Sequence, residues 1–284
     1  MGFLNHFFGT KRLDLDPSYL KKWDEDGYFI LEGAFSEREI NSFNDHVDRL
    51  WSERRSLEPP IVIDFWEGDL NGQRILFKDA PEGSRKLVHK LNNLYIDFEW
   101  CRDMCLSPVI VKALKKLMSR DPMIINSLIF EKGSQQPDHF DTYSMPPPEG
   151  GNLVVTSICL EDIHPDAGAV HFYPGSHKIP PYIFSDGGVR MTDSSESTAA
   201  EEYTRAELKK RNIEKVPFIG KKGDVLFWHA QLYHGGGKIA NHDLTRKSLV
   251  THYWSNFTPP PPKKSLKHAE SAYYMHRKHP SPWT

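Results

Sequence analysis

The first third of the chain carries hydrophobic residues at helical spacing. From Ser36 onward these residues mark one face of a helix: Ile40, Phe43, Val47, Leu50 and Trp51. Ser36 and Glu39 have the spacing of a capping box, which starts a helix. The sequence predicts helices over 16–24, from Ser36, along the stripe of Leu87, Leu91, Leu94 and Phe98, and from Ser107–Pro108 through Met118.

The remainder of the chain has a β-type pattern. From residue 123, short apolar runs are separated by Gly, Pro, Asp and Asn, which is typical of a sandwich or barrel of antiparallel strands. We therefore expect one domain over residues 1–284, in which a mostly helical part (1–122) packs on a barrel core (123–256). The expected strands are the early run 27–33 and then 123–131, 152–160, 168–173, 214–219, 224–229 and 246–255.

Three segments do not fit the barrel wall. The proline-rich residues 145–151 and the polar residues 185–212 read as surface connections. Because a connection of this length is unusual inside a compact domain, 185–212 is predicted to be either a lid or a plain insertion. Pro259–Pro262 would end the last strand, and the tail 257–284 shows no obvious structure.

Composition narrows the classes of function. Hydrophobic residues make up 38% of the 284 residues, enough for a sizeable core. A net charge of -2 gives no field that would attract nucleic acid. No stretch approaches the roughly 20 apolar residues that span a bilayer, and the first residues lack the features of a secretion signal. Three cysteines, read as buried hydrophobes, suit a reducing compartment. We expect a cytoplasmic protein with neither membrane nor nucleic acid as partner, and the oligomeric state stays open.

The candidate chemistry begins with His139 and Asp141. In an extended strand, residues two apart point to the same face, so one metal ion could bind both while Phe140 points away. With a second histidine they would form the two-histidine, one-carboxylate triad of non-haem iron enzymes. Taken alone, such a pair is more often a surface hydrogen-bonding pair.

The segment 223–254 offers the missing parts. It contains His229 at the end of an apolar strand and His234 directly before three glycines. We select His234, because absent side chains would leave room for substrate beside a metal. Further on, Arg246 and Ser248 would share one strand face and could hold a carboxylate of a dicarboxylic acid co-substrate.

At this point the sequence resembles the phytanoyl-CoA dioxygenase family of non-haem iron oxygenases, from about residue 16 to 256. Several segments resemble the family's markers and occur in its order. These are WDEDGYFILEGAFSEREI, FEKGSQQPDHFD, AGAVHFYPGSHK, KKGDVLFWHAQLYHGG and finally Arg246, which stands where the family places its 2-oxoglutarate arginine. Each marker is common by itself, but five in the right order are specific.

The resemblance implies a mainly β fold with flanking helices, a double-stranded β-helix of the jelly-roll, cupin-like kind. It implies Fe(II) held by His139, Asp141 and His234, and 2-oxoglutarate chelating that iron with its far carboxylate on Arg246. Dioxygen is the other co-substrate, and an unactivated C–H bond of a small-molecule substrate is hydroxylated with release of succinate and CO2. His177 would support a turn. We expect structural or surface roles for His164, His171, His229, His242 and His252.

Other functions are compatible with the same residues. Desaturation, epoxidation or halogenation could follow from the same site, although halogenases of this family replace the ligand carboxylate and Asp141 is present. A zinc hydrolase uses similar ligands but would leave Arg246 without a role. A non-catalytic sensor that binds metal and 2-oxoglutarate is the non-enzyme alternative. The substrate is not identified, although aromatic residues could line its pocket, namely Phe65, Trp66, Tyr143, Phe172 and Trp228.

Overall fold

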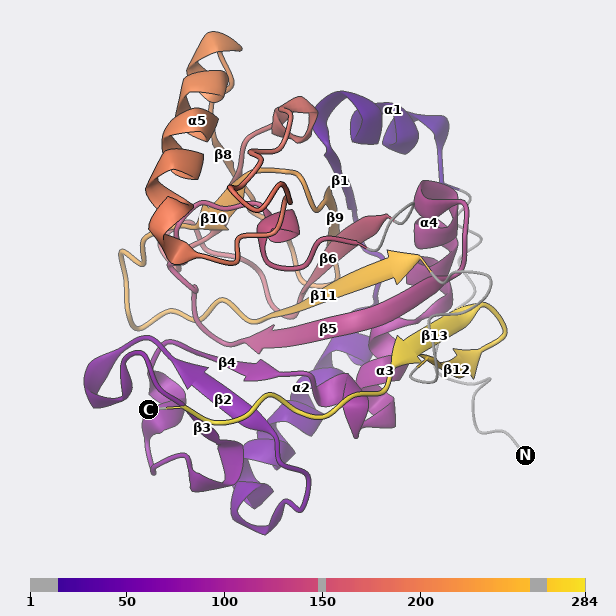
Figure 1. Ribbon diagram of the computed structural model, residues 1–284. Coiled ribbons are helices and arrows are strands. Elements are labelled where there is room, and N and C mark those ends of the chain that lie inside the picture. Colours follow the sequence, from indigo (N-terminus) through magenta and orange to yellow (C-terminus); the bar gives the residue numbers. More distant parts are fainter. Residues whose placement is uncertain (1–14, 148–151, 256–264, 284) are drawn as a thin grey trace.

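Two β-sheets that face each other form the centre of the fold, and the computed structural model describes residues 15–147, 152–255 and 265–283 (Figure 1). The larger sheet has the strand order β1-β9-β6-β11-β5-β4-β2-β3, and β13 pairs with both β5 and β12. The smaller sheet has the order β10-β7-β8. The strands are β1 (Tyr28–Leu31), β2 (Val62–Phe65), β3 (Arg74–Leu76), β4 (His89–Asn92), β5 (Pro122–Phe130), β6 (Leu153–Cys159), β7 (Val170–Phe172), β8 (Val216–Pro217), β9 (Val225–His229), β10 (His234–Gly236), β11 (Ser248–Ser255), β12 (Ser265–Ala269) and β13 (Ala272–Met275).

The strand register sets which side chains face the space between the sheets. Val250 of β11 is paired with Leu128 of β5 and with Ser157 of β6, so these side chains share one face. The smaller sheet covers this face, and apolar residues of both sheets pack together between them. These two facing sheets, antiparallel except where β13 pairs with β5, confirm the predicted double-stranded β-helix.

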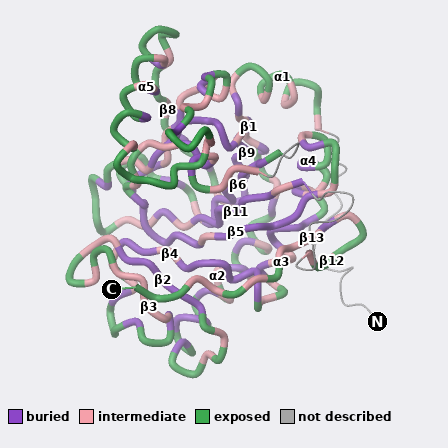
Figure 2. Tube along the Cα trace, in the orientation of Figure 1, coloured by how far each residue is buried: buried purple, intermediate pink, exposed green. Residues whose placement is uncertain are grey.

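The helices before residue 122 cover the outer face of the larger sheet, whereas the helix Ser197–Lys210 packs in a separate cluster. The capping box at Ser36 is present, with Ser36 N donating to Glu39 Oε2 at 2.7 Å, and the helix that it starts buries its predicted apolar stripe. Figure 2 shows the central strands buried and α5 largely exposed. No helix in the described ranges has the length and hydropathy needed to cross a membrane. The helices are α1 (Pro17–Asp26), α2 (Glu37–Glu53), α3 (Glu99–Cys105), α4 (Pro108–Met118) and α5 (Ser197–Lys210).

The helix predicted along Leu87, Leu91, Leu94 and Phe98 is wrong. The chain forms β4 and then a short 3-10 helix, Leu94–Ile96. Leu91 pairs with Ile129 of β5 and with Ile63 of β2, so it is buried as part of the sheet. Hydrogen bonding to neighbouring strands has therefore overridden a spacing that also fits a helix.

The two ends of the domain also contain strands that the sequence pattern did not predict. Helices predominate before residue 122, but β2, β3 and β4 extend the larger sheet. The tail, predicted to lack structure, forms the hairpin β12–β13 and then returns to β3 at Trp283 (Figure 1). Residues 185–212 contain α5, and their role as a lid stays a prediction. Residues 1–14 and the proline run 259–262 lie outside the described residues.

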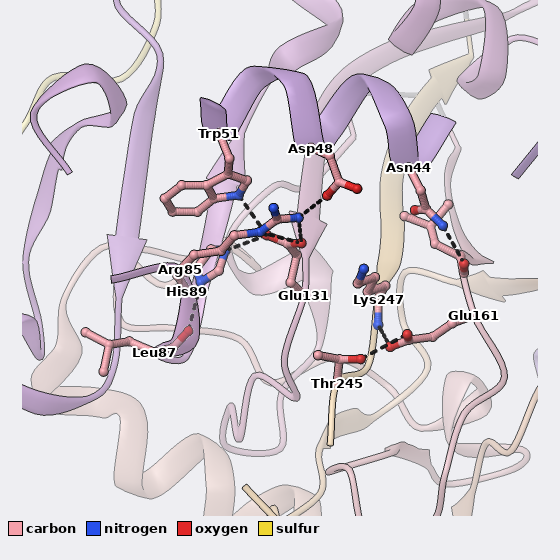
Figure 3. Close-up of polar contacts among 11 residues, drawn as sticks. Asn44, Asp48, Trp51, Arg85, Leu87, His89, Glu131, Glu161, Thr245 and Lys247 are labelled. Carbon is pink, nitrogen blue, oxygen red and sulfur yellow. Dashed lines mark hydrogen bonds and ion pairs between the residues drawn. The ribbon is translucent and has the colours of Figure 1, made fainter. Parts of the chain in front are cut away.

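A buried carboxylate, Glu131, ties α2 to the sheet (Figure 3). It accepts a hydrogen bond from Trp51 Nε1 at 2.7 Å and two from Arg85 Nε at 3.0 and 3.1 Å. Its Oε2 lies 3.4 Å from His89 Nε2, and Arg85 also pairs with Asp48 of α2. Burial would raise the pKa of Glu131, but His89 and Arg85 together hold it at about 2.

Glu131→Gln is therefore expected to lower the free energy of unfolding by roughly 3 kcal/mol at neutral pH, since the pKa falls from 4.5 to about 2 on folding. Because the pKa is lower in the folded state, the stabilisation is complete above about pH 4.5 and is lost as the pH falls towards 2. Urea unfolding of both proteins at several pH values measures this difference. The fully exposed Glu82→Gln is the control, and a Glu131 effect that did not shrink with acid would contradict the prediction.

Candidate metal centre

Two histidines and an aspartate meet where the smaller sheet approaches the segment after β5. Potential ligand atoms of His139, Asp141 and His234 all lie within 4.8 Å of one another. Nε2 of His139 is 3.7 Å from Asp141 Oδ1, and Nε2 of His234 is 3.8 Å from Asp141 Oδ2. This donor set and spacing fit a divalent iron with positions left open for reactants.

Backbone pairing brings the distal histidine to the other two. The N–H of His139 donates to His234 O at 2.8 Å, and the N–H of His234 donates to His139 O at 3.1 Å. His139 and Asp141 point to the same side, as expected for an extended backbone, and after Phe140 the chain turns into a short 3-10 helix, Asp141–Tyr143. Phe140 points away from the ligands, as predicted, and is buried against Tyr233.

The two imidazole rings are held by backbone carbonyls. Nδ1 of His139 lies 2.8 Å from Pro137 O, and Nδ1 of His234 lies 2.9 Å from Leu232 O. A ring nitrogen in such a position donates its proton to the carbonyl, so Nε2 carries the lone pair. Both rings therefore present a metal-binding nitrogen to Asp141.

Protonation states suit a metal site as well. Burial lowers the pKa of His234 to about 4, so this ring is neutral near pH 7. Burial would raise the pKa of Asp141, but His234 and His252 hold it well below its ordinary value. Burial would lower the pKa of His139, but Asp141 raises it above its ordinary value, so a metal that binds this ring must displace a proton. A carboxylate and a neutral imidazole are the forms that bind a metal.

The glycines after His234 have a different role from the one expected. A Cβ at Gly235 would lie 2.2 Å from Asp138 Oδ1, and a Cβ at Gly236 would lie 2.5 Å from Ser134 Oγ. Glycine is needed at these two positions because the segment that contains Ser134 and Asp138 packs directly against the backbone there. The space was expected to serve substrate. This close packing holds the segment that leads into His139.

A cavity of about 210 Å³ adjoins the three candidate ligands. Its apolar wall comes from alternate positions of the larger sheet, and its polar residues come from several different segments. The non-ligand residues that line it include Lys90, Asn126, Leu128, Phe130, Ser134, Gln136, Ser144, Met145, Ser157, Leu226, Trp228, Val250 and His252.

Arg246 also lines this cavity, and its side chain is almost fully buried. Its Nη1 lies 3.5 Å from Ser248 Oγ, its Nε has no hydrogen-bond partner, and no ion pair joins it to a described carboxylate. Burial lowers the pKa of Arg246 to about 10, so it stays charged at neutral pH. A buried cation of this kind calls for an anion.

The residues on either side of Arg246 fix its backbone. Thr245 Oγ1 donates to Glu161 at 2.9 Å and Lys247 N donates to Glu161 at 2.7 Å (Figure 3). Lys247 lines a separate open groove of about 870 Å³, whereas Arg246 lines the cavity. Arg246 and Lys247 thus serve different spaces, as the strand alternation predicts.

Two residues contact Asp141, a role that the sequence did not indicate for either of them. Trp228 Nε1 donates to Asp141 Oδ2 at 3.1 Å, and His252 Nε2 lies 3.5 Å from Asp141 Oδ1. His252 could have been found by continuing the two-residue period from Arg246 through Ser248. Lys90 also lines the cavity and could not be found, because β4 was predicted to be part of a helix.

The other candidate residues lie elsewhere. The ring of His229 lies tilted against those of Trp23 and His177, with centroids 5.7 Å from each, and is not part of the candidate metal-binding group. The ring of His177 supports the turn at Gly27, where a Cβ would lie 2.4 Å from its Nδ1. Of the five aromatics considered for a pocket, Trp228 lines the cavity, and Phe65, Trp66, Tyr143 and Phe172 do not.

A double-stranded β-helix with two histidines and a carboxylate at one end defines the class of non-haem iron oxygenases. The family model described as phytanoyl-CoA dioxygenase (PhyH) matches residues 23–248. Peroxisomal phytanoyl-CoA dioxygenase of Mus musculus is 25% identical over 247 residues, a match that covers 83% of this chain and 67% of the relative. Ectoine dioxygenase of Nocardia farcinica is 25% identical over 237 residues, covering 78% and 72%.

A solved structure shows the same fold. The non-haem α-ketoglutarate-dependent carbocyclase SnoK from nogalamycin biosynthesis superposes with a TM-score of 0.63 at 18% identity, over 86% of this chain and 85% of SnoK. The chain belongs to the phytanoyl-CoA dioxygenase family, whose members are Fe(II)- and 2-oxoglutarate-dependent dioxygenases. The resemblance seen in the sequence is confirmed, and iron, 2-oxoglutarate and dioxygen are the cofactors of this class.

Proposed function

We propose that this protein hydroxylates an unactivated C–H bond of a small molecule, with release of succinate and CO2. His139, Asp141 and His234 hold Fe(II), and Arg246 with Ser248 holds the far carboxylate of 2-oxoglutarate. The observation that carries the proposal is the buried guanidinium of Arg246 in the cavity that the three ligands adjoin. When bound, the iron and 2-oxoglutarate supply the oxidising chemistry with dioxygen.

The protein's own residues bind and orient the reactants. Arg246 supplies a charge that is already desolvated, so a carboxylate that reaches it gains a strong charge-assisted hydrogen bond. Lys90 also lines the cavity, but its ammonium group lies 3.4 Å from Asp64 Oδ2, so its charge is already paired and Arg246 is the cation open to an anionic co-substrate. Leu128, Leu226 and Val250 form the apolar wall that excludes water between these cations and the metal ligands.

Halogenation is disfavoured by Asp141. A carboxylate at this position occupies the place that a halide would need, and it is fixed by Trp228 and His252. Desaturation and epoxidation stay as alternatives, and SnoK is named as a carbocyclase. The polar side chains of Asn126, Gln136 and Ser144 favour a small polar substrate rather than a lipid tail. The cytoplasmic location stays a proposal, since the mammalian relatives are named as peroxisomal.

The proposal predicts a visible charge-transfer band when Fe(II) and 2-oxoglutarate are added to the protein without oxygen. Such a band would report a keto acid bound at the iron, so titration followed by absorbance would measure binding directly. Succinate lacks the keto group and serves as the control that gives no band. Metal-loaded protein that showed no band at saturating 2-oxoglutarate would refute the proposed function.

A further inference from the structure

The edge of β5 opposite β11 is shared by two elements and has a gap between them. β4 pairs with Leu128–Phe130, and β13 pairs with Met123 and Ile124. Side chains close the gap: Asn93 Oδ1 accepts from Ser127 N at 3.1 Å, and Tyr95 OH donates to Ile125 O at 3.2 Å. The cavity-lining Asn126 lies at the centre of this gap.

Arg277, which follows β13, reaches Asn126 across the gap. Its Nη2 lies 3.4 Å from Oδ1 of Asn126 and 3.4 Å from Oδ1 of Asn93. The backbone of this segment is held by Tyr95 OH, whose single proton is shared between Met275 O at 3.0 Å and Ile125 O at 3.2 Å. A guanidinium can only donate, so the atom of Asn126 that faces Arg277 must be its oxygen.

The orientation of the Asn126 amide in turn affects His252 and, through it, the candidate metal ligand Asp141. With Oδ1 of Asn126 facing Arg277, Nδ2 faces His252 Nδ1 at 3.4 Å and donates to it. A neutral His252 that accepts at Nδ1 carries its proton on Nε2, which lies 3.5 Å from Asp141 Oδ1. Arg277 can only donate and the carboxylate of Asp141 can only accept. Each hydrogen bond in the series therefore donates in the direction from Arg277 towards Asp141.

We propose that Arg277 is a positioning residue that acts through Asn126 and His252 to orient the carboxylate of Asp141. The inference rests on the proposed role of Asp141 as an iron ligand. Its links are long, 3.4 to 3.5 Å, so they orient dipoles more than they add binding energy. Both His252 and Arg277 lie beyond residues 23–248, the part of the chain that matches the family.

Without Arg277, Asn126 can turn its amide by half a rotation at little cost. Its oxygen would then face His252 and favour a proton on Nδ1, which leaves the Nε2 lone pair against Asp141. The carboxylate would lose a donor and meet a repulsive partner. Loss of such an outer contact typically weakens metal binding by about 10- to 100-fold.

The test compares the full-length wild type with Arg277→Met, Arg277→Lys and Asn126→Asp. The imidazole ¹⁵N signals of His252 in zinc-loaded protein report which ring nitrogen carries the proton, and His252→Gln assigns them. Cobalt(II) titration gives the metal dissociation constant. We expect an Nε2-protonated ring in the wild type, a shift towards Nδ1 with about tenfold weaker cobalt binding in Arg277→Met, and recovery in Arg277→Lys. Asn126→Asp, which can only accept, sets a second carboxylate against the ring and should add a proton at Nδ1 of His252, so that both ring nitrogens are protonated.

His279→Ala is the matched control, because His279 anchors the same segment through Asp97 at 2.5 Å without joining the chain of links. If His279→Ala and Arg277→Met changed the His252 signals and the cobalt dissociation constant equally, the cause would be a general loss of order in the C-terminal segment. That result would overturn the proposal. Unchanged His252 signals in both Arg277→Met and Asn126→Asp would do so too. Failure of the proposed function is separate, since it appears as wild type that binds no Fe(II) with 2-oxoglutarate.

Discussion

Asp141→Ala is expected to abolish succinate formation, with turnover of 2-oxoglutarate reduced roughly a thousandfold or more. The carboxylate is the anionic member of the candidate triad, and it lies 3.7 and 3.8 Å from the two imidazole nitrogens. Without it, two neutral rings hold the iron weakly, and the donors Trp228 and His252 lose their acceptor. Succinate released per enzyme, measured together with bound iron, gives the result.

Asp103→Ala controls for loss of an aspartate, since Asp103 pairs with His268 at 2.8 Å and does not line the cavity. It should retain iron and succinate formation. His234→Ala should behave like Asp141→Ala, because its ring is the candidate ligand that comes from the smaller sheet. Iron-dependent turnover in Asp141→Ala close to that of the wild type would show that the metal is bound elsewhere.

Local signals in the sequence were sufficient for some elements of this fold. The capping box at Ser36 and the pair Ser107–Pro108 each place a helix start correctly, because a cap is a property of a few adjacent residues. The strand β10 has no such signal. It is three residues long, contains two glycines, and forms through pairing with β7 and with His139. Tertiary context defines an element of this kind.

The candidate site divides in the same way. His139 and Asp141 were proposed from their spacing, and His234 from the glycines that follow it. Arg246 was proposed from the strand face that it shares with Ser248 and from the family resemblance. Asn126 and Lys90 join the cavity only because of the register of β5 and β4, which the sequence pattern does not contain. The position of Arg277 is still harder to predict from the sequence. It depends on the parallel pairing of β13 with β5, which are separated by about 150 residues.

Arg246→Met is expected to raise the 2-oxoglutarate concentration needed for half-saturation by roughly 100-fold, since removing one partner of a buried charged pair costs about 2 to 5 kcal/mol. Ser248→Ala should have a smaller effect, because its hydroxyl is 3.5 Å from the guanidinium and is neutral. Arg246→Lys keeps the charge but loses the two-pronged geometry, so its effect should lie between the two. The anaerobic charge-transfer band, titrated with 2-oxoglutarate, measures all three.

Two further measurements separate binding from folding. Lys247→Met changes the adjacent cation, which lines the 870 Å³ groove, and should leave the 2-oxoglutarate titration unchanged. The metal-free Arg246→Met protein should be at least as stable as the wild type, because Arg246 has no ion pair with a described carboxylate to lose, and an unpaired buried charge is removed. An unchanged 2-oxoglutarate requirement in a folded Arg246→Met protein would mean that another cation holds the carboxylate, and Lys90 would then be the residue to replace.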